Sequence, residues 1–146
     1  MSIKENKDLM INYFKESNES KGDAAKLTAI IDKYVDAGFV YHTTNGDTNL
    51  DQTKQLTINL WKSFPDYRND IEEILAEGDK VSIRHTWGGT HKGQFMGIAP
   101  TGKKAKIAAI SITRINKGKM VETWVINDSL GLMQQIGAFP AAPPRK

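Results

Sequence analysis

The sequence predicts an α+β fold, with three helices packed on one face of a curved antiparallel sheet and a short helix at the end. Two observations support this prediction. Apolar residues recur at helical spacing in three segments before Pro65, and they alternate as in β-strands in four segments after it. At 146 residues the chain is long enough to bury one core, so we expect a single domain over residues 1–137.

Three helices are expected in the first half of the chain. The first spans residues 6–17. The second starts after Asp23, a suitable N-cap, and ends near Gly38, because glycine is favoured just past a helix C-terminus. Thr48 and Asp51 have the spacing of a capping box, so the third helix is expected to begin there.

Strands are expected mainly in the second half of the chain. One short β-prone run, FVYH, comes earlier, between the second and third helices. The later strands are predicted at Tyr67–Ala76, Val81–Trp87, Ala105–Ile115 and Met120–Asn127. Short turns that contain glycine separate the members of each pair, and such turns favour antiparallel hairpins.

Asp128 stands where the last strand gives way to a short amphipathic helix, in the run NDSLGLMQ. Its carboxylate is predicted to cap the free N–H groups of that helix, and such hydrogen bonds lower the pKa of a carboxyl group. A capping aspartate at the rim of a pocket can still contact a ligand. The segment 138–146, AFPAAPPRK, is rich in proline and alanine, and we expect a mobile tail.

The composition excludes several classes of site and location. There is no cysteine, so disulfides, thiolate nucleophiles and sulfur ligands are excluded. No stretch approaches the roughly 18 apolar residues that a membrane span needs, so no membrane association is expected. The N-terminal run MSIKENKDLM has no secretory apolar region. Together these features favour a cytoplasmic protein.

Basic side chains gather on two predicted turns, although the formal net charge is only +3. We interpret them as the solvated rim of the hairpins, because acidic residues are interleaved and no known nucleic-acid-binding motif is present. No nucleic-acid partner is therefore expected. The alternative is that this basic hairpin binds nucleic acid, which would give measurable affinity at low salt. The lysines concerned are Lys103, Lys104, Lys106, Lys117 and Lys119.

The reactive side chains are three histidines and a few carboxylates. His42 follows the short early strand, where it lies either at a pocket mouth or in a surface loop. His85 shares a strand face with Val81 and Ile83, which is more typical of a core histidine, and His91 follows Gly-Gly-Thr in a loop. These histidines lack the close spacing of a metal site, and no phosphate-binding glycine loop is present. Neither a metal nor a cofactor is therefore expected.

Large apolar side chains are available to line a pocket. A pocket of that kind with a few polar groups suits a small hydrophobic or aromatic ligand. The candidates are Trp61, Phe64, Trp87, Phe95, Met96 and Trp124.

Three segments together carry a family resemblance. They are FPDYRNDIEEILAEGDKVSIRHTW at 64–87, GTHKGQFMGIAPTGKK at 89–104 and GKMVETWVINDSLGLMQQIG at 118–137. The chain resembles the SnoaL-like polyketide cyclases, also called ester cyclases. The resemblance implies a cone-shaped α+β barrel of the nuclear-transport-factor-two-like fold with a deep apolar pocket. It also implies a homodimer or higher homo-oligomer, and a cofactor-free and metal-free aldol cyclisation.

The resemblance also places the family's catalytic positions on this chain. The aspartate that serves as general acid/base in the cyclases falls at Val125, and the glutamine and histidine of the preceding strand fall at Ala109 and Ser111. A further polar position falls near His42. Strand alternation puts Val125 on one face with Thr123 and Asn127, and away from Asp128 unless a bulge intervenes.

Two functions are therefore expected as alternatives. The first is an enzyme that binds a small hydrophobic or cyclic metabolite and transfers a proton, as in aldol cyclisation or isomerisation. Its candidate catalytic residues are His42, His85 and Asp128. The second is a binding module of the same fold without turnover. In both, the expected pocket residues are Trp61, Phe64, Ala109, Ser111, Thr123, Val125 and Asn127.

Overall fold

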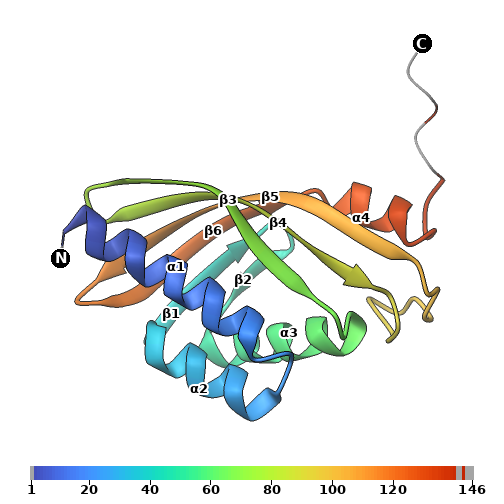
Figure 1. The fold of residues 1–146 in the computed structure, drawn as a ribbon, viewed down its shortest axis with the longest axis horizontal. Helices are drawn as coiled ribbons and strands as arrows, with labels where there is room; N and C mark the ends of the chain where they lie inside the picture. Colours follow the sequence, from blue (N-terminus) through green and yellow to red (C-terminus); the bar gives the residue numbers. More distant parts are fainter. Residues whose placement is uncertain (1, 141–142, 144–146) are drawn as a thin grey trace.

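The computed structural model describes residues 2–140 and 143 of the protein. Figure 1 shows helices α1 to α3 on one side of a curved sheet, with α4 at one end of that sheet. The α+β architecture that the sequence predicts is confirmed. In chain order the elements are α1 (Ile3–Glu19), α2 (Ala24–Tyr34), β1 (Val35–Thr43), β2 (Gly46–Thr48), α3 (Leu50–Ser63), β3 (Arg68–Glu77), β4 (Lys80–Thr90), β5 (Lys104–Asn116), β6 (Lys119–Asn127) and α4 (Ser129–Gln135).

The strands form one mixed sheet in the order β2-β1-β6-β5-β4-β3. Strands β3 to β6 pair with their sequence neighbours in antiparallel fashion, as predicted. Strand β1, however, pairs with β6 in parallel. The expectation of an antiparallel sheet is therefore wrong at this junction. A long connection through α3 and four strands separates β1 from β6, and a long connection is what parallel pairing requires.

The end of α2 also differs from the prediction, because the chain turns into β1 at Val35. Lys119, at the start of β6, donates from Nζ to the carbonyls of Asp32 and Lys33 at 2.9 and 2.8 Å. These bonds satisfy carbonyls of the last helical turn and place a cation at the negative end of the helix dipole. Gly38 therefore lies inside a strand and does not end the helix.

Helix α3 begins one residue later than predicted. The side chain of Asn49 accepts from the Gln52 N–H, and the side chain of Gln52 accepts from the Asn49 N–H, both at 2.9 Å. This pair is a capping box, so the assignment of Thr48 and Asp51 is wrong by one position. Thr48 instead ends β2, and its hydroxyl pairs with that of Thr53 at 3.0 Å.

Two hydrophobic clusters hold the helices against the sheet, and burial of their apolar surface is the main driving force for folding. The first contains residues from α1, α2, β1, β4, β5 and β6: Leu9, Met10, Ile31, Val35, Phe39, Val81, Ile83, Ile115 and Met120. The second joins α4 to β4, β5 and the end of α3: Phe64, Trp87, Ala105, Ile107, Ala109, Leu132 and Ile136.

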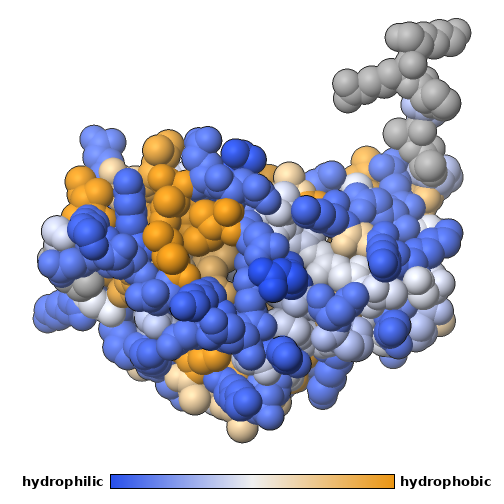
Figure 2. Space-filling view, in the orientation of Figure 1, coloured by the Kyte–Doolittle hydropathy of each residue, from blue (hydrophilic) through white to orange (hydrophobic). Residues whose placement is uncertain are grey.

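The surface in Figure 2 is largely hydrophilic, with apolar side chains gathered at the left, where α1 and β3 lie in Figure 1. Exposed apolar residues of these two elements are Ile3, Ile11 and Leu75. None of the helices in the described part of the chain combines the length and apolarity of a membrane span.

The chain just after α4 remains attached to that helix. The backbone N–H groups of Ala138 and Phe139 donate to the Met133 carbonyl at 2.8 and 3.3 Å. Most of the predicted mobile tail, residues 141–142 and 144–146, lies outside the described residues.

Candidate active site

A cavity of about 210 Å³ lies between helices α1 to α3 and the sheet. Its helical wall is largely apolar and includes Met10, Phe14, Leu60 and Trp61. Polar side chains concentrate on the opposite wall, where they can fix the orientation of a bound molecule. The residues of that wall include Tyr41, Asn69, His85, Ser111, Thr113, Thr123 and Val125.

His85 projects from β4 into this polar wall and is only 5% exposed. Its Nδ1 lies 2.7 Å from Oδ1 of Asn69. An amide oxygen only accepts, so Nδ1 donates, and the neutral ring then keeps a lone pair on Nε2. Within the described residues, this buried Nε2 has no hydrogen-bond partner. A buried acceptor without a partner at a cavity is a candidate for contact with a ligand.

The protonation state of His85 follows from its surroundings. Burial lowers its pKa to about 4, because the charged ring loses hydration. The ring of Phe14 meets it edge to face, with 5.4 Å between centroids. At neutral pH the imidazole is therefore uncharged, and Nε2 is free to accept a proton.

Asn69 orients His85 and is itself held from α1. The Asn18 side chain donates to the Asn69 carbonyl and accepts from the Asn69 N–H, both at 2.9 Å. Burial raises the pKa of the neighbouring Tyr67, and the Asn69 side chain partly opposes that effect. Helix α1 thus positions the residue that selects the tautomer of the histidine.

Three tyrosines line the same cavity: Tyr13, Tyr41 and Tyr67. Burial raises the pKa of Tyr13 and of Tyr41 to about 12, and burial raises the pKa of Tyr67 as well. Repulsion from Tyr41 and Tyr13 also contributes to the raised pKa of Tyr67, so the hydroxyls lie within electrostatic reach of one another. All three are protonated at neutral pH and are available as donors.

Five of the residues that the sequence indicated lie together on the cavity wall: Trp61, His85, Ser111, Thr123 and Val125. Others lie beside it. Phe64 and Ala109 belong to the hydrophobic cluster under α4. The side chain of Asn127 accepts from Nε1 of Trp87 at 2.9 Å.

His42 lies on the other face of the sheet, next in sequence to the cavity residue Tyr41. Its Nε2 and Nδ1 lie 2.7 Å from Glu122 and 2.8 Å from Asp47, and its ring stacks on Trp124 at 5.2 Å. The hydrogen bond with Glu122, followed by that with Asp47, raises the pKa of His42. The structure therefore separates His42 from His85 and favours its charged form.

Asp128 caps α4, as predicted, and accepts from the Gly131 N–H at 2.9 Å. Its exposed carboxylate does not line the cavity. His91 is a buried loop residue, with Nδ1 accepting from the Thr101 N–H at 3.3 Å and the ring packed near Phe64. Of the predicted catalytic residues, His42 and Asp128 thus line one open depression on the outer face of the sheet, whereas His85 lines the cavity.

Sequence reasoning missed Asn69 and the three tyrosines. Tyr13 lies inside the predicted first helix and Tyr67 at the start of a predicted strand, and neither position marks a polar site residue. The alternation of Tyr41 with His42 was the available signal, since only one of the two can face the helices. The choice between them required the parallel pairing of Tyr41 with Thr123.

The family model for the SnoaL-like polyketide cyclase matches residues 21–136, which cover all but α1 and the tail. The chain belongs to this family. A search of functionally curated proteins finds no significant match. Within the described residues, no group of three or more His, Cys, Asp or Glu side chains is arranged to hold a metal ion.

Solved structures agree with the family assignment. AclR from Streptomyces galilaeus, described as a hydroxylase, is 28% identical with a TM-score of 0.81, over 97% of this chain and 87% of that one. A protein from Jannaschia sp. CCS1, described as a SnoaL-like polyketide cyclase, is 21% identical with a TM-score of 0.84, over 96% and 97%. One from Bacillus cereus ATCC 10987, described as a polyketide cyclase, is 30% identical with a TM-score of 0.64, over 78% of each chain.

The surroundings of His42 and His85 shift their pKa values in opposite directions. In NMR, His42 should titrate above its ordinary pKa of 6.5 and His85 near 4. As pH falls from 6.5 to 4, the unfolded chain takes up a proton at position 85 before the folded protein does. The free energy of unfolding should therefore fall by up to about 1.4 kcal/mol per pH unit more in the wild type than in His85→Gln.

Urea unfolding of both proteins across this pH range measures that difference. The effect of His42 has the opposite sign, because its stabilisation is lost as pH rises through its raised pKa, and it cancels between the two proteins. Equal pH dependence in wild type and His85→Gln would contradict the buried, neutral state of His85.

Proposed function

We propose that this protein binds a small cyclic ketone in the cavity and catalyses cofactor-free proton transfer, with His85 as the general base. The observation that carries the proposal is that His85 lines the cavity and that its buried Nε2 has no hydrogen-bond partner within the described residues. Membership of the SnoaL-like polyketide cyclase family supports the reaction class.

The proposed step begins with the ketone oxygen directed toward the tyrosine hydroxyls. Nε2 of His85 takes a proton from the carbon next to the carbonyl, and the electron pair of that C–H bond moves to the carbonyl oxygen. The products are an enolate and an imidazolium. In an aldol cyclisation the enolate carbon attacks an internal carbonyl, and the new alkoxide takes the proton back from the imidazolium. In an isomerisation the enolate instead regains that proton at another carbon.

The surroundings favour this charge separation in two ways. The phenol hydroxyls of Tyr13, Tyr41 and Tyr67 donate to the developing oxyanion, which is stabilised more strongly by such donors in a dry cavity than in water. Asn69 accepts from Nδ1 and keeps the imidazolium oriented. The low pKa of His85 makes it available as a base even in mildly acidic solution.

A base at position 85 accounts for the apolar residue at position 125. The resemblance places the cyclase aspartate at Val125, which lies on the cavity wall and is 5% exposed. In the register of the sheet, Val125 pairs with Ser111, and His85 pairs with Ala109 two positions along β5. The proposed base on β4 therefore lies two strands away from the position of the cyclase aspartate on β6, on the same face of the sheet.

The base can be tested without knowledge of the natural substrate. Wild type should catalyse exchange of the α-hydrogens of 2-tetralone in D2O, measured by NMR. Substitution His85→Gln should lower the rate at least about 100-fold, the usual contribution of a general base. His42→Gln, on the opposite face, is the matched control and should leave the rate unchanged.

The pH profile gives a second readout of the same experiment. Because the pKa of His85 is about 4, the exchange rate should be flat from pH 8 to 5 and fall below pH 4. Equal rates in wild type and His85→Gln would remove His85 as the base. Binding of 2-tetralone without any exchange would favour the alternative, a binding module without turnover.

We also propose that two copies associate through the outer face of the sheet. Four exposed apolar side chains form a block there, because Ile110 pairs with Ile126 and Ile112 pairs with Trp124 across β5 and β6. Ile126 is 64% exposed. A compact apolar patch of this kind marks an interaction surface, and a second copy presents the same patch for self-complementary contact.

Light scattering coupled to size-exclusion chromatography tests this association. Wild type should elute with twice the mass of one chain, and Ile126→Lys should elute as a monomer, because a buried lysine without a partner opposes association. The control, Ile11→Lys, changes an exposed isoleucine on α1 and should remain dimeric. A wild-type monomer at high micromolar concentration would contradict the proposal.

A further inference from the structure

We infer that the ligand of the cavity is uncharged and limited to one or two fused rings, an inference that takes the cavity of the proposed function as the binding site. Three properties of the cavity point to this ligand class: the charge of its lining, its volume and the distribution of its polar groups. None of these uses the identity of the base.

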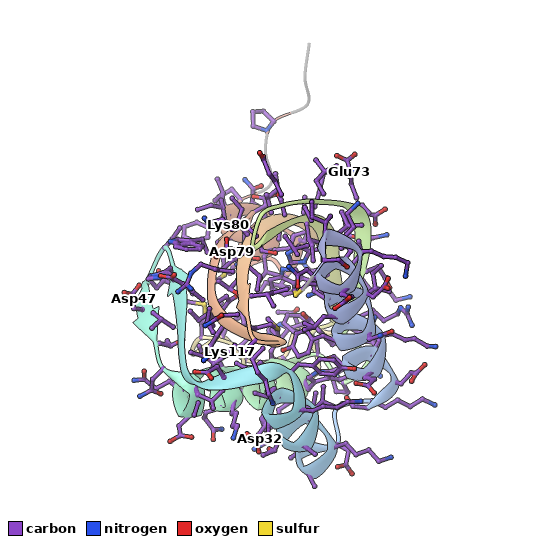
Figure 3. All side chains as sticks on the ribbon, turned by 90° about the vertical axis from the view of Figure 1, so that its left-hand side faces the viewer. Asp32, Asp47, Glu73, Asp79, Lys80 and Lys117 are labelled. Carbon is purple, nitrogen blue, oxygen red and sulfur yellow. The ribbon has the colours of Figure 1, made fainter. Side chains whose placement is uncertain are left out.

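The cavity lining carries no formal charge. Among the described residues that line it, none is Asp, Glu, Lys or Arg. Its titratable groups, His85 and three tyrosines, are in their neutral forms at pH 7. In Figure 3, which looks along the molecule, the labelled Asp32, Asp47 and Glu73 lie at the periphery, around the packed interior.

An uncharged lining discriminates against ionised ligands. A carboxylate, phosphate or ammonium group would leave water and find no counter-ion, and such uncompensated burial is strongly unfavourable. Hydroxyl and carbonyl groups, in contrast, can pair with Ser111, Thr123 and the tyrosines. The lining therefore selects neutral compounds that contain oxygen.

The volume limits the number of rings. An apolar cavity of about 150 Å³ holds a benzene molecule, whereas pockets for drug-sized ligands range over about 300–1,000 Å³. At about 210 Å³ this cavity lies between them and accommodates one ring with substituents or two fused rings. A four-ring polyketide exceeds this space.

A substitution at Leu56 can test, without disturbing the core, whether the uncharged lining excludes ionised ligands. It lines the cavity from α3 and is 49% exposed, so it lies where the cavity meets solvent. An arginine at this position can keep its stem on the apolar wall and its guanidinium near water. It would add the cation that the lining lacks.

The experiment measures Kd at pH 7 by calorimetry for three probes: 2-tetralone, its 6-carboxylate and a four-ring steroid ketone. Wild type should bind the carboxylate at least about 100-fold more weakly than 2-tetralone, and the steroid ketone should not saturate. Leu56→Arg should improve carboxylate binding at least tenfold and leave 2-tetralone within threefold. Leu56→Gln, polar but uncharged, is the control and should not improve carboxylate binding.

The inference is overturned if wild type binds the carboxylate as tightly as 2-tetralone, if the steroid saturates and is displaced by 2-tetralone, or if 2-tetralone fails to bind. Its failure is separable from failure of the proposed chemistry. Tight binding by a wild type that catalyses no exchange would support the ligand class and reject proton transfer.

Discussion

The register of the sheet is the constraint on which the rest of the structure depends. Because side chains alternate between faces, each cross-strand pairing assigns a residue either to the cavity or to the outer surface. The pairing of Tyr41 with Thr123 turns Tyr41 inward, and the adjacent pairing of His42 with Trp124 turns His42 outward. A shift by one residue would exchange these two roles and move a charged cluster into the core.

The outward and inward histidines show how strongly this assignment affects chemistry. His42 lies between two carboxylates at the surface, and its pKa is raised. His85 lies in an apolar cavity with an amide as its neighbour, and its pKa is lowered to about 4. The same side chain is therefore easier to protonate at the surface and remains a neutral acceptor in the cavity.

Helix α1 contributes more to the site than apolar cover. The side chain of Asn18, near the C-terminus of α1, hydrogen-bonds both the N–H and the carbonyl of Asn69. It therefore holds β3 as a neighbouring strand would. Asn69 in turn fixes the imidazole of His85. This sequence of contacts couples the packing of a helix to the tautomer of a buried histidine, and it leaves the polar wall of the cavity preorganised.

Much of the fold was predictable because its signals are local. The apolar spacing of Leu27, Ile30 and Ile31 predicts a helix, and the alternation around Val81 and Ile83 predicts a buried strand. The parallel pairing of β1 and the end of α2 were not predictable, because both depend on contacts with β6 from far along the chain.

The same distinction applies to the site. Alternation predicts that Thr123, Val125 and Asn127 share one face, because parity is a local property of one strand. Thr123 and Val125 line the cavity, and Asn127 does not. The relation of His85 to Asn69 was missed, since it joins two strands through a register that contains a bulge between Ile71 and Glu73. Only the three-dimensional arrangement shows that His85 has one nitrogen bonded and the other free.

The most direct test of the account is the tautomer of His85. Nitrogen-15 NMR of the protein at pH 7, with His85 assigned by comparison with His85→Gln, reports which ring nitrogen carries the proton. The account predicts a neutral ring with the proton on Nδ1 and a bare Nε2. A proton on Nε2, or a doubly protonated ring, would contradict it, because neither form leaves a base facing the cavity.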